Sequence, residues 1–435
     1  MSELSPSLCF YGDDFTGSTD ALDALASANV SAALLLEPTA EAARLLPDVE
    51  AVGLAGMSRA MSPDEMEVHL PDAFRFLAGL NPRILHYKVC STFDSSPTKG
   101  SIGRAMEIGR RFYGSKSTPI IVGTPALGRY VAFGHLFARA GHAPAIHRLD
   151  RHPVMSRHPV TPMAEADLRR HMSLQTTLPV DLISLVDLET GNFLALDIDD
   201  RAILFDTTSP AHLAAIGGWL DRESRDAPLF CVGSSAVEAA FASKLRNGGA
   251  SSRPPRLALG PHPVAVVSGS CSPVTARQID AASQSGFSLI RLEPMDLIDD
   301  RSMMLGCERA IEVAMKAIET GRSPLVYTAQ GVADFGGGVV GIRRDDLERR
   351  IGIALGKVLA TLIERAGLKK VIVAGGDTSG IVARALGLAV LQVATSLTPG
   401  APLCRGLGLD GREIEIALKG GQMGNEDFFA RARDA

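Results

Sequence analysis

The sequence has few cysteines and no long apolar run. Six cysteines occur among 435 residues, without a Cys-x-x-Cys pair or a His/Cys spacing typical of zinc sites. No apolar run approaches the ~20 residues that a membrane-spanning helix needs. The start of the chain has neither the basic nor the apolar segment of a signal peptide. We therefore expect a cytoplasmic protein with free thiols, and no disulfide framework or membrane partner.

The chain also lacks an excess of positive charge. Its 44 Lys and Arg residues against 49 Asp and Glu residues give a net charge of -5. Proteins whose main partner is a nucleic-acid backbone usually carry a basic excess. Apolar residues make up 46% and charged residues 21% of the chain, an ordinary balance for a globular protein. We expect small molecules, and no nucleic acid, as partners.

Short apolar runs alternate with amphipathic stretches along the whole chain. This pattern predicts buried strands at Leu8–Tyr11, Ala32–Leu36, Ile84–Val89, Pro119–Val122, Leu182–Val186, Ala202–Phe205 and Leu229–Val232. It predicts helices at Ser18–Asn29, Pro63–Leu80, Ile102–Phe112, 209–224 and 234–246. Strands that alternate with helices are typical of parallel sheets in an α/β fold.

A turn-rich segment, Asn247–Arg256, divides the chain in two. Strand and helix signals restart after it, beginning with Val264–Val267. We predict two α/β domains, each a mainly parallel sheet flanked by helices, with a cleft between them. Their predicted bounds are 1–247 for the first domain, 248–262 for the linker and 263–435 for the second domain.

The first predicted strand ends at two adjacent carboxylates, Asp13 and Asp14. Open α/β sheets bind ligands at the carboxyl ends of their strands, so a functional site is expected here. One alternative is structural, because Asp14, Thr16 or Ser18 could cap the helix that follows. A cap accounts for one residue and leaves the other carboxylate unexplained.

A hydroxyl-rich loop, Lys88–Gly103, follows another predicted strand and ends in glycines at the start of a helix. Hydroxyl and backbone N–H groups suit a polyol or an anion, although an ordinary polar loop has the same composition. Cys90 is expected to be an inert buried thiol, because no histidine lies near it in the sequence.

Two small-residue turns, Ser268–Pro273 and Gly375–Gly380, each join a strand to a helix in the second domain. Glycines allow the backbone to approach a phosphate, and a helix N-terminus favours negative charge. Two such turns predict a nucleotide site, to which Thr398–Pro402 and Lys419–Gly424 could contribute. Gly406–Gly411 fits the pattern G-x-G-x-x-G but precedes a predicted strand, so we reject a dinucleotide fingerprint there.

Together these motifs resemble the four-carbon acid sugar kinase family. The resemblance rests on Asp13–Gly17, the Lys88–Gly103 loop, and the Ser268–Ser272, Gly375–Ser379 and Lys419–Phe429 segments in the family's order. The run Cys90–Ser95 and the segment His158–Met163 are most like the 3-oxo-tetronate kinase branch. The likeness therefore covers nearly the whole chain.

The resemblance implies an ATP-dependent kinase with an N-terminal sugar-acid domain and a C-terminal nucleotide domain, working with Mg²⁺. By motif, it implies that the substrate is held by Asp13, Thr16, Arg59, Lys88, Ser91, Thr92, Phe93, Asp94 and His158. It implies that ATP is held by Ser270, Ser272, Gly375, Gly376, Asp377, Thr378 and Gly421. Asp14 or Asp13 is expected to act on the reacting hydroxyl, Asp377 is a candidate partner of Mg²⁺, and a homodimer is the usual assembly.

Two segments depart from the branch pattern. Lys419–Gly424 reads Lys-Gly-Gly-Gln-Met-Gly where the branch has Lys-Ser-Gly-Asn-Phe-Gly, and Pro125–Arg129 reads Pro-Ala-Leu-Gly-Arg where it has Pro-Val-Asn-Gly-Arg. The substrate alternatives are therefore 3-oxo-tetronate on its terminal hydroxyl, the branched acid 3-oxo-isoapionate, D-threonate and D-erythronate. A non-catalytic sugar-acid binding protein is the alternative from another class, but it would not need two phosphate-type turns.

Overall fold

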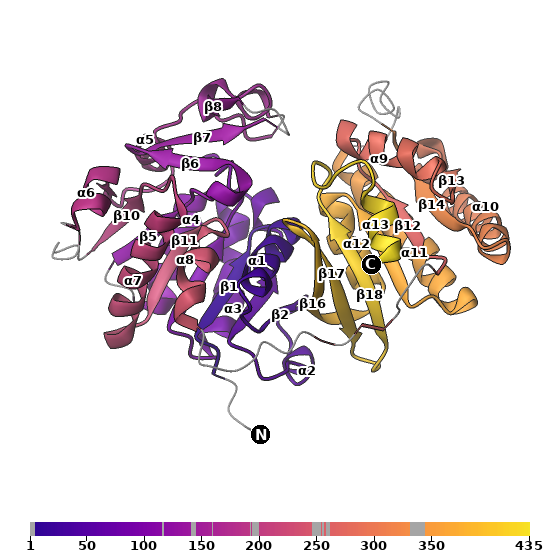
Figure 1. The fold of residues 1–435 in the computed structure, drawn as a ribbon, viewed down its shortest axis with the longest axis horizontal. Coiled ribbons are helices and arrows are strands. Elements are labelled where there is room, and N and C mark those ends of the chain that lie inside the picture. Colours follow the sequence, from indigo (N-terminus) through magenta and orange to yellow (C-terminus); the bar gives the residue numbers. More distant parts are fainter. Residues whose placement is uncertain are drawn as a thin grey trace. The chain divides into compact units, whose positions relative to one another are not determined.

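The chain forms two compact units. Met1–Leu34 with Pro47–Ser251 make the first unit, and Leu35–Leu46 with Ser252–Ala435 make the second (Figure 1). The computed structural model describes residues 5–114, 117–140, 145–158, 160–191, 193, 200–245, 254, 256–257, 262–330 and 344–435. Most of the predicted linker, 248–262, lies outside these residues, so the domain bounds stay a prediction.

The first unit contains a sheet with the strand order β2-β3-β1-β4-β11-β5-β10-β9. Every pair from β3 to β9 along this order is parallel, which confirms the predicted fold class. The strands are β1 (Leu8–Gly12), β2 (Ala32–Leu35), β3 (Ala51–Ala55), β4 (Ile84–Lys88), β5 (Ser117–Ile121), β9 (Val180–Ile183), β10 (Arg201–Phe205) and β11 (Leu229–Gly233).

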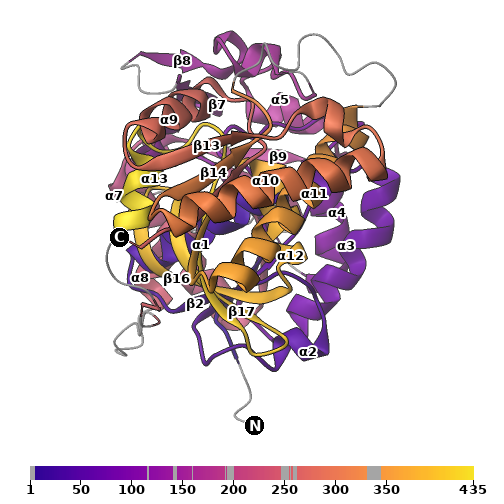
Figure 2. The ribbon, with the colours of Figure 1, turned by 90° about the vertical axis from the view of Figure 1, so that its right-hand side faces the viewer.

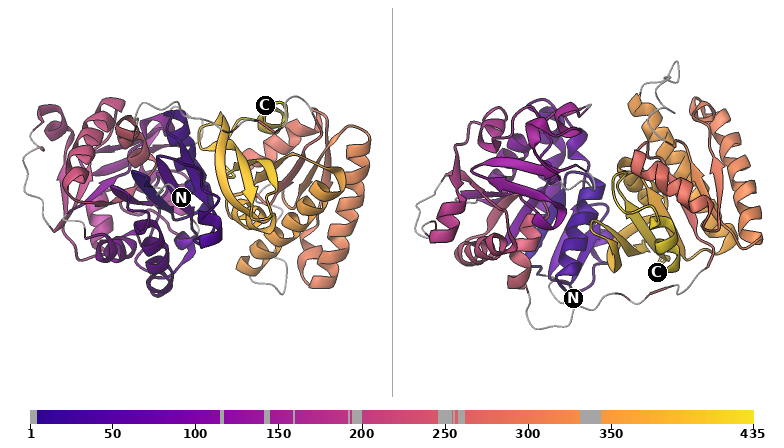
Figure 3. Two further views of the ribbon diagram at one scale, coloured as in Figure 1. Left: turned by 90° about the horizontal axis from the view of Figure 1, so that it is seen from below. Right: turned by 45° about the horizontal axis from the view of Figure 1, so that its top comes forward.

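Helices cover both faces of this sheet (Figure 3). On one face α1, α7 and α8 pack together, and on the other α3 packs against α4. Their bounds are α1 (Phe15–Ser27), α3 (Pro63–Ala78), α4 (Ile102–Tyr113), α7 (Pro210–Asp226) and α8 (Ala236–Leu245). The aromatic rings of Tyr11, Phe74, Tyr87 and Phe230 meet beneath α3. Buried apolar strands and amphipathic helices thus form the core as their sequence patterns predict.

The predicted strand Leu182–Val186 is wrong in its second half, because β9 ends at Ile183 and α6 (Leu185–Thr190) follows. Ser184 is the N-cap of α6: its side chain accepts from the Asp187 N–H, and the Asp187 carboxylate accepts from the Ser184 N–H. This capping box starts a helix inside an apolar run that alone suits a strand.

A three-stranded antiparallel sheet, absent from the sequence predictions, follows β5 in the first unit. It consists of β6 (Arg129–Ala132), β7 (His135–Arg139) and β8 (Ile146–Arg148), and α5 (Leu168–Ser173) comes after it. Asp206, fully buried beyond β10, accepts hydrogen bonds from the backbone N–H groups of Phe133, Gly134 and Leu185. One buried carboxylate thus ties the β6–β7 turn to the end of the large sheet.

The second unit contains a sheet with the order β13-β14-β12-β15-β18-β17-β16. Pairs from β13 to β18 are parallel, while β17 is antiparallel to both β18 and β16. The strands are β12 (Ala265–Ser268), β13 (Phe287–Arg291), β14 (Ser323–Tyr327), β15 (Lys370–Ala374), β16 (Leu388–Thr398), β17 (Ala401–Gly408) and β18 (Glu413–Lys419). This sheet is mainly parallel, as predicted.

Two groups of helices pack on the second sheet. Helices α10 (Asp300–Glu319), α11 (Arg344–Ala366) and α12 (Gly376–Ala385) pack side by side (Figure 2), and α9 (Pro273–Ser283) packs with α13 (Phe428–Asp434). The short helix α2 (Ala40–Ala43) also belongs to this unit. Among the helices described here, none has the length and apolar character needed to cross a membrane.

Strand β17 was not predicted from the sequence. The segment Thr398–Pro402 contains the two-residue turn between β16 and β17, Pro399–Gly400, with Gly400 at a positive φ of 76°. Gly406 and Gly408 lie within β17, and Gly411, at φ 78°, turns the chain into β18. The strand-then-strand arrangement confirms that this G-x-G-x-x-G match is not a dinucleotide fingerprint.

Candidate functional site

The central strands of the first unit end at one edge of the sheet. In the parallel ladder Gly12 is paired with Lys88, Lys88 with Gly233, and Gly233 with Ile121. The loops that follow β1, β4, β11 and β5 therefore start side by side. This is the edge at which open parallel sheets bind ligands, and it carries most of the residues predicted to hold the substrate.

Arg59 joins the two adjacent aspartates at the end of β1. Its Nε and Nη2 donate to the two carboxylate oxygens of Asp13 at 3.0 and 2.8 Å. Its Nη1 lies 2.9 Å from Asp14 Oδ2, and its backbone N–H donates to the Asp13 carbonyl. A guanidinium has five N–H donors, and these side-chain contacts use three. With 25% of its side chain exposed, Arg59 retains donors that a ligand can reach.

Burial changes the protonation of Asp13. Loss of hydration, together with the nearby negative charge of Asp14, raises the pKa of Asp13 to about 6, against the attraction of Arg59. The exposure of the two side chains agrees with this, because 5% of the Asp13 side chain is exposed against 21% for Asp14. Its carboxylate gains a proton in a pH range where free aspartic acid stays ionised.

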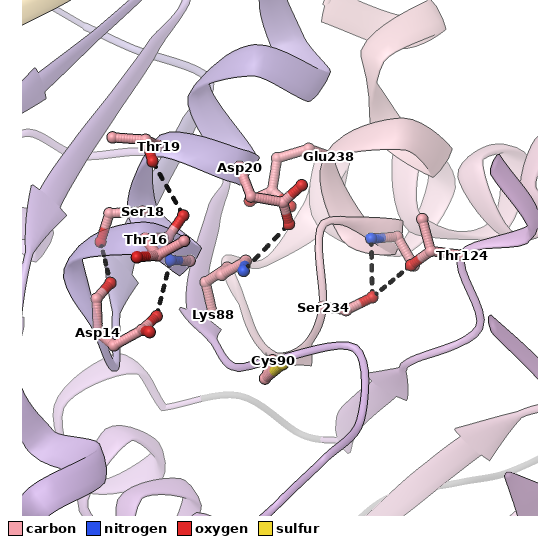
Figure 4. Close-up of polar contacts among 12 residues, drawn as sticks. Asp14, Thr16, Ser18, Thr19, Asp20, Lys88, Cys90, Thr124, Ser234 and Glu238 are labelled. Atoms are coloured by element: carbon pink, nitrogen blue, oxygen red, sulfur yellow. Dashed lines mark hydrogen bonds and ion pairs between the residues drawn. The ribbon is translucent and has the colours of Figure 1, made fainter. Parts of the chain in front are cut away.

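Asp14 also caps helix α1. Its Oδ1 accepts from the Gly17 N–H at 2.7 Å, and its carbonyl accepts from the Ser18 hydroxyl (Figure 4). A Cβ atom on Gly17 would lie 2.4 Å from Asp14 Oδ1 and 2.8 Å from Lys88 Nζ, so a larger residue would displace the Asp14 cap and the Lys88 amine. The structural reading of Asp14 as a helix cap is confirmed, and its functional role stays a prediction. The Thr16 hydroxyl oxygen is buried and has no hydrogen-bond partner among the described residues.

Lys88, the last residue of β4, brings a second positive charge to this edge. Its side chain is 1% exposed, and its Nζ lies 3.2 Å from Asp20 Oδ2 (Figure 4). Burial lowers the pKa of Lys88, but the carboxylates of Asp20 and Asp14 outweigh that effect and raise it above its ordinary value. Lys88 therefore stays charged at neutral pH.

The loop after β4 folds back over this edge. The Thr92 hydroxyl donates to Asp94 Oδ1 at 2.6 Å, and Phe93 is fully buried at a positive φ of 55°. Burial raises the pKa of Asp94, but Arg59, the Thr92 hydrogen bond and His158 lower it below its ordinary value overall. Ser91 is also buried in this loop. Asp94, one of the predicted substrate residues of this loop, thus lies within the electrostatic reach of Arg59.

Cys90 is not suited to nucleophilic chemistry. Burial and the nearby Asp94 raise the pKa of its thiol, which keeps it protonated at neutral pH. The inert thiol expected from the sequence agrees with this environment.

Two residues at the same edge were missed by the sequence analysis. Thr124, after β5, and Ser234, after β11, share a 2.8 Å hydrogen bond between their hydroxyls, and Ser234 Oγ also accepts from the Ala236 N–H at 3.1 Å (Figure 4). Both strands had been predicted, so the rule that parallel strands end at one edge could have identified these hydroxyls.

The second unit brings its small-residue turns together in a similar way. Ser268 is paired with Ala374, and Ala374 with Lys419, so β12, β15 and β18 end side by side. A Cβ atom on Gly421 would lie 2.7 Å from Ser270 Oγ, and one on Gly375 would lie 2.9 Å from Thr378 Oγ1. The two turns and the Lys419–Gly424 segment, predicted separately, therefore form one cluster.

Two helices begin at this cluster. Ser272 is the N-cap of α9, and its hydroxyl accepts from the Val274 N–H at 3.2 Å. Helix α12 begins at Gly376, and Gly375 precedes it at a φ of 127° that favours glycine. The Asp377 side chain lies outside the described part. Among the described residues, no group of three or more His, Cys, Asp or Glu side chains is placed to hold a metal ion.

Two family models match the chain. A sugar-binding N-terminal domain matches residues 8–241, and a nucleotide-binding C-terminal domain matches residues 265–429. The chain belongs to the four-carbon acid sugar kinase family. The expected resemblance is confirmed, and the chain is a phosphotransferase that acts on a hydroxyl group.

Named relatives cover nearly the full chain. A 3-oxo-isoapionate kinase of Paraburkholderia graminis is 42% identical over 98% of this chain and 94% of its own. A 3-oxo-tetronate kinase of Methylobacterium radiotolerans is 31% identical over 99% of both chains. A solved structure from Salmonella typhimurium LT2 has a TM-score of 0.81 at 24% identity, covering 98% of both chains. At that identity the solved structure supports the fold alone.

Replacement of Asp14 should separate its capping role from its chemistry. Asp14→Ala removes the acceptor of the Gly17 N–H and should lower the free energy of unfolding by ~1 kcal/mol relative to Asp14→Ser, which can still cap α1. Urea unfolding of both variants measures this difference. Because both variants lack the carboxylate, both should lose turnover. Equal stability of the two variants would contradict the cap, and near-normal kcat in Asp14→Ser would contradict a role in chemistry.

Proposed function

We propose that this protein is an ATP-dependent sugar-acid kinase whose substrate is 3-oxo-isoapionate or a closely related branched acid. The observation that carries the proposal is the Arg59-linked pair of aspartates at the end of β1. Carboxylates bind substrate hydroxyls, and a guanidinium with free donors binds a carboxylate. A hydroxylated acid offers both groups.

The charges at this edge of the first sheet support these separate roles for the aspartates and Arg59. Asp13, Asp14, Asp20 and Asp94 face two cations, Arg59 and Lys88, so the carboxylates outnumber the positive charges. Hydroxyl groups of the substrate suit the aspartates, whereas its carboxylate is attracted by Arg59. Thr16, Ser91, Thr92, Phe93 and His158 would complete the contacts. Lys88, which is already paired with Asp20, would act mainly through its charge.

We assign proton acceptance to Asp13 and orientation of the reacting hydroxyl to Asp14. A base works best when its pKa lies near the working pH, and burial brings the pKa of Asp13 to about 6. Asp14 is fixed by its cap to Gly17 and is the more exposed of the two. Phosphoryl transfer needs mainly alignment and charge stabilisation, so one base and an oriented hydroxyl suffice on the acceptor side.

The cluster in the second unit would hold ATP. Ser270, Ser272, Gly375, Gly376, Thr378 and Gly421 surround the N-terminal ends of α9 and α12, where N–H groups favour phosphate oxygens. The described residues offer no preformed Mg²⁺ site. We therefore propose that Mg²⁺ is held by ATP phosphates and water, as this ion often is, with Asp377 as an additional partner.

The choice of acid rests on the segment Pro125–Arg129. It differs from the 3-oxo-tetronate kinase pattern, and it directly follows Thr124, which bonds Ser234 at the substrate edge. We propose that the changed segment alters the surroundings of the substrate near Thr124, while the aspartates after β1 are the same in both kinds of kinase. The 42% identity with a 3-oxo-isoapionate kinase, against 31% with a 3-oxo-tetronate kinase, favours the same acid.

An ADP-release assay tests the substrate directly. With ATP and Mg²⁺, kcat/KM should be highest for 3-oxo-isoapionate and about 10- to 200-fold lower for 3-oxo-tetronate, the range that one small group changes in a pocket. D-threonate and D-erythronate should be slower still. Turnover with none of these acids would contradict a sugar-acid kinase, and a preference for 3-oxo-tetronate would contradict the choice of acid. As a matched variant, Ala126→Val with Leu127→Asn should reduce the difference in kcat/KM between 3-oxo-isoapionate and 3-oxo-tetronate.

The activity should depend on pH through Asp13. The base must be ionised, and its pKa is raised to about 6, so kcat/KM should fall roughly tenfold per pH unit below this value. Profiles of the wild type and of Asp13→Asn between pH 5 and 8 provide the measurement. The residual kcat/KM of Asp13→Asn should not show this fall below pH 6. Any fall in kcat/KM that comes from protonation of ATP itself should persist in both proteins. An unchanged fall in Asp13→Asn would show that another group is the base.

A further inference from the structure

Lys419, the last residue of β18, carries a buried amine beside the nucleotide cluster. Its residue is 1% exposed, and its Nζ donates to Thr275 Oγ1 at 3.0 Å. The Thr275 hydroxyl in turn donates to the Gly421 carbonyl at 2.9 Å. The Phe428 ring lies 5.9 Å from Nζ. The amine therefore lies beside the first turn of α9, and Thr275 links it to the Gly421 turn through two successive hydrogen bonds.

Several described ionisable groups of the elements around Lys419 have other partners, and Glu415, on the same strand, pairs with Arg256. Arg277 pairs with Glu426, Asp280 bonds Gln330, Arg431 donates to the Leu397 carbonyl, Arg433 donates to Ser285, and Lys370 donates to the carbonyls of Arg433 and Ala435. In the described part of the chain, Lys419 forms no ion pair with a carboxylate. Burial alone lowers the pKa of its amine to about 7.

Packing does not account for a lysine at this position. A methionine has a similar volume and would fill the same apolar space without the cost of burying a charge. An ammonium has three N–H donors, and Thr275 accepts one of them. The two remaining donors have no acceptor among the described residues. An anion at the neighbouring turn would supply both the acceptor and the missing negative charge.

The backbone connects Lys419 with that turn. The Gly375 N–H donates to the Lys419 carbonyl at 2.9 Å, and Gly420 and Gly421 follow Lys419 directly. Ser270 approaches Gly421 so closely that a Cβ atom there would lie 2.7 Å from its hydroxyl oxygen. Lys419 therefore belongs to the cluster that would hold ATP, and its amine has no role among those that the sequence motifs assigned to single residues.

We propose that Lys419 is the positively charged partner of the nucleotide's phosphates, an inference that rests on the proposed function of this cluster. Phosphates at the N-terminus of α9 would stabilise the ammonium form, and the ammonium would stabilise their charge in return. The helix ends and glycine turns supply only partial charges. In the described part of this cluster, Lys419 is the residue that supplies a whole unit of positive charge. Because the free amine is only partly protonated near neutral pH, nucleotide binding should draw a proton from solvent.

Calorimetry of MgADP binding at pH 8 tests this inference. The phosphates of ADP are already ionised at this pH, so proton uptake reports on the protein. In buffers of different ionisation enthalpy, the wild type should take up as much as about 0.9 proton per ADP, from an amine whose pKa is about 7 before binding. Adenosine, which has no phosphates, should bind without proton uptake.

Two variants of Lys419 separate the role of charge from that of packing. Lys419→Met should bind MgADP about 10- to 100-fold more weakly and without proton uptake, because the charge-assisted contact is lost. Lys419→Arg should bind MgADP without proton uptake, because a guanidinium is already charged. As a control, Lys370→Met removes a buried lysine at the opposite end of β15, and its proton uptake should equal that of the wild type.

Each outcome decides between the claims. Buffer-independent enthalpy in the wild type, or equal proton uptake in Lys419→Met, would overturn the role of Lys419 while leaving a nucleotide site intact. Absence of MgADP binding in the wild type would overturn the proposed nucleotide site and the inference with it. If Lys419→Met does not fold, the comparison of Lys419→Arg with the wild type still decides, because only the wild type should take up a proton.

Discussion

The site in the first unit depends on one guanidinium that holds two adjacent carboxylates. Asp13 and Asp14 are neighbours at the end of a buried strand, and the negative charge of Asp14 disfavours the ionisation of Asp13. Arg59 contacts both, and its own backbone is bonded to Asp13. Gly17 leaves space for Asp14 to cap α1 beside Lys88. Removal of the guanidinium would leave a cluster of carboxylates with a single cation.

The two units have the same architecture but gather groups of opposite charge. Each is a mainly parallel sheet whose central strands end side by side. In the first unit this edge gathers carboxylates that suit hydroxyl groups. In the second it gathers helix N-termini, glycine turns and Lys419, which suit phosphates. A kinase needs both kinds of site, because an acceptor hydroxyl must lose a proton while the transferred phosphoryl group keeps its negative charge stabilised.

The sequence predicted most strands and helices, because buried strands and amphipathic helices each have a distinct period. It did not predict β17, whose proline and two glycines are typical of turns, and it extended β9 into α6 because a capping box interrupts an apolar run. It named Asp13 from its place at the end of a predicted strand and Arg59 through the family motifs, but their pairing joins positions 46 residues apart and became visible only in the fold. Thr124 and Ser234 were not named from the sequence, although their strands were predicted, and Lys419 was named only as the first residue of a glycine-rich segment, because its buried amine becomes visible only in the fold.

A double-mutant cycle on Asp13 and Arg59 tests the central interaction most directly. The quantities to measure are kcat/KM of Asp13→Asn, Arg59→Lys and the double variant with the preferred acid. If the guanidinium acts by holding this carboxylate in place, the two effects should overlap, with an interaction energy of at least ~1.5 kcal/mol. Effects that add within ~0.5 kcal/mol would mean that the two residues act independently, and would contradict the account.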